Sequence, residues 1–142
     1  MVFIDGAANP EMIMVKQYSR VKPDAVVFTM SAPRSLMYLE KKWMEDCLLL
    51  FGEEKLWITL TRADCLDPRE RGLLLEHVRT FFVKQFTDLG LDGCEKWCDE
   101  HIILLDAYNA YQFRTGKNMA LEDGMSIETL ETRIFPQLGA GR

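Results

Sequence analysis

The sequence predicts an α/β fold, with a parallel sheet of about four strands and helices on both faces. Short apolar runs alternate along the chain with longer segments that carry an apolar stripe at helical spacing. Strands that alternate with helices pair in parallel through right-handed crossovers. With 142 residues, 48% of them hydrophobic, the chain has enough apolar material for one domain with a core.

The first two predicted strands flank a helix. Residues 2–4 form a short β-branched and aromatic run. Asn9 and Pro10 then read as an N-cap and first helical residue, and this helix ends before Pro23. Residues 25–30 are continuously apolar, which is typical of a strand buried on both faces of a parallel sheet.

A second helix and a third strand follow. Gly52 ends the helix, and residues 56–60 form a β-rich run after it. The apolar stripe of the helix, at steps of three and four residues, consists of Leu36, Leu39, Trp43, Cys47 and Leu50.

The next helix carries the clearest boundary signals. Asp67, Pro68 and Glu70 make a start of the capping-box type, and Gly90 suits the position after the last turn. We expect the first turn, residues 69–71, to be solvated. The predicted apolar face consists of Leu74, Val78, Phe81, Phe82, Phe86 and Leu89.

The last part of the chain contains a short segment around Trp97 and a fourth strand at residues 102–105. A looser stretch leads to a final helix that Ser126 caps and Pro136 ends. We therefore expect one partial α/β domain over residues 1–138 and a flexible tail over 139–142.

Composition excludes two classes of function. The formal net charge is −5 and the pI about 5.1, so we expect no nucleic-acid binding. No apolar run reaches the ~18 residues of a membrane span, and the N-terminus lacks the features of a signal peptide. We expect a cytoplasmic protein whose four cysteines are reduced.

Cys94, Cys98 and His101 form a C-x3-C-x2-H pattern. Three possible zinc ligands lie close together, but no second pair of residues supplies a convincing fourth. The spacing also places both thiols on one face of a helical turn beside Trp97. We therefore interpret the pattern as a packed helix face and predict no metal site.

Chemistry is expected where the predicted strands end, because ligands of open α/β sheets bind at the carboxyl ends of the strands. The residues found there are Asp5, Gly6, Thr61, Arg62, Asp64, Asp106 and Ala107. A carboxylate such as that of Asp64 can accept hydrogen bonds from two adjacent N–H donors, an edge that guanine has and adenine lacks. Arg62 can lie along a base plane, and Thr61 can tie the loop to a neighbouring strand end. Together these residue types suit guanine recognition.

The segment Thr61-Arg62-Ala63-Asp64 resembles the [NT]-K-x-D motif of P-loop GTPases. The order of several segments is similar to that of dynamin-like GTPases, including the bacterial dynamin-like and mitofusin-like branches. Residues 5–10 correspond to the switch motif of that family and residues 23–32 to the strand that follows it. Residues 106–114 correspond to its base-binding loop and residues 123–131 to its final helix. Residues 50–54 also resemble the AIG-type immunity GTPases.

The resemblance implies guanine binding by Thr61, Arg62, Asp64, Asp106 and Ala107, with Asp5 and Gly6 in a switch-II-like position. It also implies a parent that binds GTP or GDP with Mg²⁺, pairs through its G domains, and remodels a membrane. The sequence contains no G-x-x-x-x-G-K-[ST], so this chain alone is expected to be inactive and to correspond to the C-terminal part of a GTPase domain. A missing N-terminal segment would supply the P-loop.

Two other functions stay open. The switch position reads D-G-A-A rather than D-x-x-G, which favours a nucleotide-free pseudo-GTPase used as an interaction scaffold. A flavodoxin-like binding domain also fits the alternation of strands and helices, but it leaves the residues at the end of the third strand unexplained.

Overall fold

The structure is a computed structural model, and it describes residues 22–34, 38–106, 115 and 127–137. Three strands, β1 (Val26–Ser31), β2 (Leu56–Thr61) and β3 (Ile102–Leu105), form a parallel sheet in the order β1-β2-β3. The α/β class and parallel pairing are as predicted. The strand expected at residues 2–4 and the helix after Asn9 lie outside the described residues.

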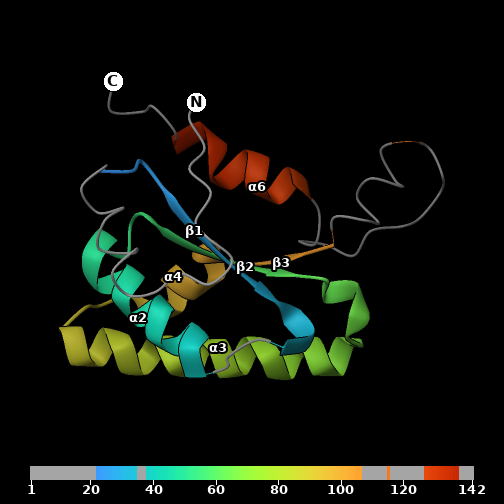
Figure 1. Ribbon diagram of the computed structural model, residues 1–142, viewed down its shortest axis with the longest axis horizontal. Coiled ribbons are helices and arrows are strands. Elements are labelled where there is room, and N and C mark those ends of the chain that lie inside the picture. Colours follow the sequence, from blue (N-terminus) through green and yellow to red (C-terminus); the bar gives the residue numbers. More distant parts are fainter. Residues whose placement is uncertain (1–21, 35–37, 107–114, 116–126, 138–142) are drawn as a thin grey trace.

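Helices cover both faces of the sheet, as expected (Figure 1). On one face lie α2 (Tyr38–Phe51), α3 (Pro68–Leu89) and α4 (Cys94–His101), and the larger core cluster forms between them and the strands. On the other face lies α6 (Ile127–Arg133). A smaller hydrophobic cluster there joins Leu130 of α6 and the following Ile134 to β2 and β3. The fold therefore has three layers: helix, sheet and helices.

The central strand is β2, and its first five residues are all buried. Alternate residues face the two clusters: Leu56, Ile58 and Leu60 the larger one, Trp57 the smaller. The prediction that residues 25–30 are buried on both faces was wrong. Burial alternates along β1, and Val27 is 45% exposed on the face where α6 covers β2 and β3.

The ends of α3 follow the predicted chemistry. The Asp67 carboxylate accepts a hydrogen bond from the Glu70 amide, and the Glu70 carboxylate accepts one from the Asp67 amide. Gly90 closes the helix in the left-handed conformation, with φ of 68°.

The apolar face of α3 is narrower than predicted. Val78, Phe82 and Phe86 are buried, whereas Leu89 is 41% exposed in the last turn. Arg71 is buried rather than solvated, because its position lies on the same face as Val78, seven residues further along the helix.

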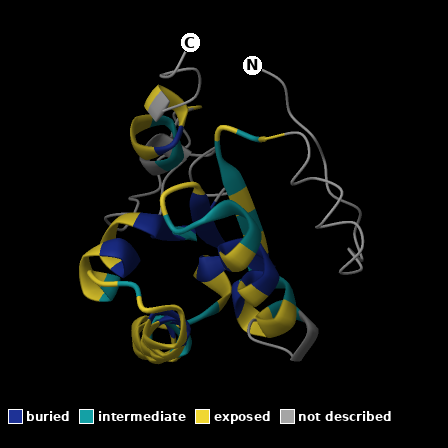
Figure 2. Cartoon of the chain, turned by 90° about the vertical axis from the view of Figure 1, so that its left-hand side faces the viewer, coloured by how far each residue is buried: buried dark blue, intermediate teal, exposed yellow. Residues whose placement is uncertain are grey.

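The buried stripe of α2 is rotated relative to the predicted one. Met44 and Leu48 are buried beside Cys47, whereas Trp43 and Leu50 are only half-buried. Figure 2 shows the same division for the whole fold, with buried segments between the layers and exposed ones on the outer sides of the helices. The helix begins at Tyr38, so Leu36 falls before it and outside the described residues. Gly52 follows the last turn with φ of 84°, as its predicted role at the helix end requires.

The segment around Trp97 is the helix α4, which runs directly into β3. The α6 helix ends at Arg133, three residues before Pro136, and the chain continues as a 3-10 turn, η3 (Phe135–Gln137). Ile134 is buried between these two elements against Trp57 and Ile103 of the sheet. The predicted cap, Ser126, lies outside the described residues.

Candidate functional site at the carboxyl edge of the sheet

The carboxyl ends of the three strands lie level with one another. Ser31 of β1 pairs with Thr61 of β2, and Thr61 pairs with Leu105 of β3. Arg62 and Asp106, the residues that follow these two strand ends, therefore lie next to each other at the edge of the sheet. The parallel register brings the predicted base-recognition segment and the predicted base-loop aspartate to one edge.

Two short 3-10 turns form the surface of this edge. The turns η1 (Ala32–Arg34) and η2 (Ala63–Cys65) follow β1 and β2 and contact one another. Ala32 and Ala63 are both buried, so small side chains allow the two turns to pack closely. No role was predicted from the sequence for the turn after β1.

Thr61 ties the edge together as predicted. Its Oγ1 donates a hydrogen bond of 3.1 Å to the carbonyl oxygen of Met30 on β1. Two residues earlier on both strands, the hydroxyls of Thr29 and Thr59 share a hydrogen bond of 2.9 Å. These cross-strand contacts hold the end of β2 against the end of β1, which fixes the start of the Arg62 turn.

Arg62 has an unusual backbone conformation, with φ of 56° and ψ of 37°. A non-glycine residue in this left-handed region costs of order 1 kcal/mol or more and is found preferentially at functional sites. Its guanidinium Nη2 donates to the Sγ of Cys65 at 3.7 Å. Cys65 was not predicted to take part, although its place in the turn, three residues after Arg62, is a signal for such a contact.

The two acidic residues of the edge differ in environment. The Asp64 side chain is exposed and, within the part of the chain that the structure describes, makes no hydrogen bond or ion pair. Asp106 is only 1% exposed, and it takes part in interactions of its own. Asp64 can therefore present both carboxylate oxygens outward, whereas Asp106 is a buried residue of the edge.

The other predicted site residues, Asp5, Gly6 and Ala107, lie outside the described residues. The C-x3-C-x2-H pattern lies at the opposite end of the sheet, near the start of β2. There the Trp97 indole donates to the Glu53 carbonyl at 2.6 Å, and His101 Nδ1 donates to the Leu56 carbonyl at 2.6 Å. These are the contacts of a packed helix face, as the sequence indicated.

The stacking of His101 between two indoles was missed by the sequence reasoning. Its ring centroid lies 4.0 Å from that of Trp57 and 5.1 Å from that of Trp97, with both pairs nearly parallel. The four-residue spacing of Trp97 and His101 on one helix face was a signal for half of this arrangement.

Comparison with protein-family models gives no match for this chain, and comparison with curated proteins gives none either. Among the described residues, no helix is long and apolar enough to cross a membrane. The same residues contain no group of three or more His, Cys, Asp or Glu side chains placed to hold a metal ion.

Proposed function

We propose that this chain is a portion of a dynamin-like GTPase domain, and that the carboxyl edge of its sheet binds the base of a guanine nucleotide. One observation carries the proposal: the exposed carboxylate of Asp64 lies just after the end of the central strand, close to Arg62 in a strained backbone conformation. Strain of this kind persists where the surroundings hold it, and it is concentrated at ligand-binding sites.

Hydrogen-bonding capacity makes the site selective for guanine. An ionised carboxylate only accepts hydrogen bonds, and its two oxygens match the adjacent N1–H and N2–H donors of guanine. Adenine has an acceptor at N1 and no amino group at C2, so it would face Asp64 with a lone pair. The planar guanidinium of Arg62 supplies a surface on which the base can stack.

The parent activity follows from the resemblance of the sequence to dynamin-like GTPases. In this proposal the parent is a cytoplasmic hydrolase that binds GTP and Mg²⁺, pairs through its G domains and acts on a membrane surface. The phosphate-binding loop belongs to an N-terminal segment that this sequence lacks. This chain contributes base recognition, and the triphosphate chemistry belongs to that missing segment.

A thermal melt with excess GDP and Mg²⁺, compared with ADP and Mg²⁺, tests the proposal. A ligand that binds only the folded chain stabilises it by about 2.7 kcal/mol at a hundredfold excess over its dissociation constant. We expect GDP, and not ADP, to raise the midpoint. The shift should be lost in Asp64→Ala and kept in Asp92→Ala, which removes another exposed aspartate away from the edge.

A nucleotide-free interaction scaffold is the alternative function. It is favoured by the sequence D-G-A-A at residues 5–8, because the glycine expected to face a terminal phosphate is not in its usual place. A cooperative melt that is insensitive to GDP would reject nucleotide binding by this chain and favour the scaffold.

A further inference from the structure

The strand β1 lies at one edge of the described sheet. Among the described residues, it pairs with β2 on one side and with no strand on the other (Figure 1). The Val26 amide donates to the Lys55 carbonyl at 2.8 Å, so the backbone groups of Val26 point toward β2. Because successive residues of a strand direct these groups to opposite sides, those of Val27 and Thr29 point to the outer edge. Such groups are a template on which another strand can pair.

The sequence of β1 lacks the features that usually protect an edge strand from pairing. Its six residues, VVFTMS, include no charge, proline or glycine, and their register with β2 is continuous, without a bulge. Val27 is 45% exposed, and Thr29, on the same face of the strand, is exposed too. An uncharged strand of this length is therefore suited to extension of its sheet by a partner strand.

We propose that this edge binds a second copy of the chain, and that the two β1 strands pair antiparallel about a two-fold axis through Thr29. In this register Thr29 lies opposite Thr29 of the second copy, and Val27 lies opposite Ser31 of the second copy. All three residues direct backbone groups to the outer edge, so each pair can exchange hydrogen bonds. Pairing of two identical strands in this way gives a closed dimer whose sheet runs through both copies.

Charges beside the strand favour an antiparallel partner and this register. Asp24 is exposed before β1, and Arg34 is exposed after it in the turn η1. The axis through Thr29 brings Asp24 of each copy toward Arg34 of the other, so opposite charges meet at both ends of the pair. A shift of two residues in one direction would bring Lys22 toward Arg34, and in the other would bring Pro33, which has no N–H, opposite a residue of β1.

Sedimentation equilibrium of the full chain over a series of concentrations tests this dimer. We expect the mass to rise with concentration from 16.4 kDa toward twice that value. Val27→Lys places a charge on the uncharged edge and should raise the dissociation constant of the dimer at least about tenfold. Val83→Lys is the matched control, because Val83 is 47% exposed but lies on α3, and it should leave the dissociation constant unchanged.

A second variant tests the register without altering the strand. Arg34→Asp removes the contact between opposite charges, and it keeps the proposal testable if Val27→Lys does not melt cooperatively. We expect it to weaken the dimer by about tenfold, since both ends of the pair are affected. The double variant Asp24→Arg with Arg34→Asp restores opposite charges and should recover the wild-type dissociation constant.

A chain that stays monomeric over the whole series would overturn the proposal and would leave this edge to a strand of another protein. A dimer that both Val27→Lys and Arg34→Asp leave unchanged would also overturn it, because such a dimer forms through another surface. No nucleotide is present in these measurements, so their outcome is separate from that of the melts with GDP.

Discussion

The surroundings of His101 favour the neutral form of its imidazole in the folded chain. Burial lowers its pKa below the ordinary value of 6.5, and the hydrogen bond from Nδ1 to the Leu56 carbonyl offsets this only in part. Glu100 beside it raises the pKa and Arg133 of α6 lowers it. The unfolded chain, in which none of these contacts exists, takes up a proton near pH 6.5.

His101 should therefore make stability depend on pH. Because its pKa is lower in the folded chain, the unfolded chain binds the proton first as the pH falls. The stability that neutral His101 provides is therefore present above pH 6.5 and is lost at lower pH. We expect the free energy of unfolding from denaturant titrations to fall as the pH drops below about 6.5, at up to about 1.4 kcal/mol per pH unit from this group. His101→Gln should flatten this slope, whereas the exposed His77→Gln should not. Equal slopes in wild type and His101→Gln would contradict the assignment.

The role of Thr61 was predictable from its place at the end of a strand, whereas the stacking of His101 on Trp57 was not. The Thr61 hydroxyl was expected to tie neighbouring strand ends, and it does so through the Met30 carbonyl. Nothing in the sequence indicated that Trp57 would stack on His101, because the two lie on different elements, 44 positions apart. Only the docking of α4 beside the start of β2 brings them together.

At the scale of single elements, helix ends were better predicted than helix faces. The capping box of α3 and its glycine end depend on short-range hydrogen bonds, which the sequence specifies directly. Which residues of α2 are buried depends on where the neighbouring layer touches the helix. The predicted stripe was therefore rotated, with Met44 and Leu48 fully buried in place of Trp43 and Leu50. The exposure of Val27 on β1 has the same cause, because it too depends on which part of the sheet a neighbouring helix covers.

Loss of the α3 cap should destabilise the chain measurably. Asp67→Ala removes the acceptor for the Glu70 amide and should lower the free energy of unfolding by about 1 kcal/mol. Asp88→Ala is the matched control, because it removes an exposed aspartate near the other end of α3, where a negative charge is not favoured by the helix dipole. A destabilisation by Asp88→Ala as large as that by Asp67→Ala would contradict a specific role for the cap.

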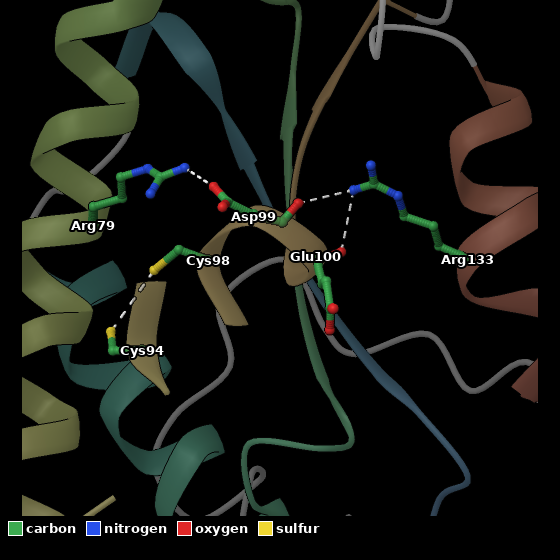
Figure 3. Close-up of polar contacts among 6 residues, drawn as sticks. All are labelled: Arg79, Cys94, Cys98, Asp99, Glu100 and Arg133. Atoms are coloured by element: carbon green, nitrogen blue, oxygen red, sulfur yellow. Dashed lines mark hydrogen bonds and ion pairs between the residues drawn. The ribbon is translucent and has the colours of Figure 1, made fainter. Parts of the chain in front are cut away.

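At the scale of the whole molecule, α4 makes polar contacts with helices on both faces of the sheet. Arg79 of α3 pairs with the Asp99 side chain, and Arg133 of α6 donates to the Asp99 and Glu100 carbonyls at 3.1 and 3.3 Å (Figure 3). The second arginine satisfies carbonyl groups at the end of α4 that lack partners within the helix. The alternation of strands and helices predicted the three-layer α/β fold, but it did not predict these ties.

The core between α3 and the sheet should account for much of the stability. Phe82 is fully buried and packs on Phe81 and Trp97, with ring centroids at 5.1 and 4.7 Å. Phe82→Ala should lower the free energy of unfolding by about 3–5 kcal/mol in chemical denaturation. Val83→Ala, at the adjacent and 47% exposed position, should change it by less than about 1 kcal/mol. Similar losses from both variants would show that α3 does not dock through this face.

The measurement that tests the proposed function most directly is a calorimetric titration of the chain with GDP and with inosine diphosphate, both with Mg²⁺. The two bases differ only in the amino group at C2, which inosine lacks. If the Asp64 carboxylate reads the N1–H and N2–H edge, GDP should bind about tenfold more tightly, because the loss of a hydrogen bond to a charged group costs about 1.5 kcal/mol. Asp64→Ala should abolish the difference. Equal affinities in the wild-type chain, or a preference that survives Asp64→Ala, would contradict guanine recognition at this edge.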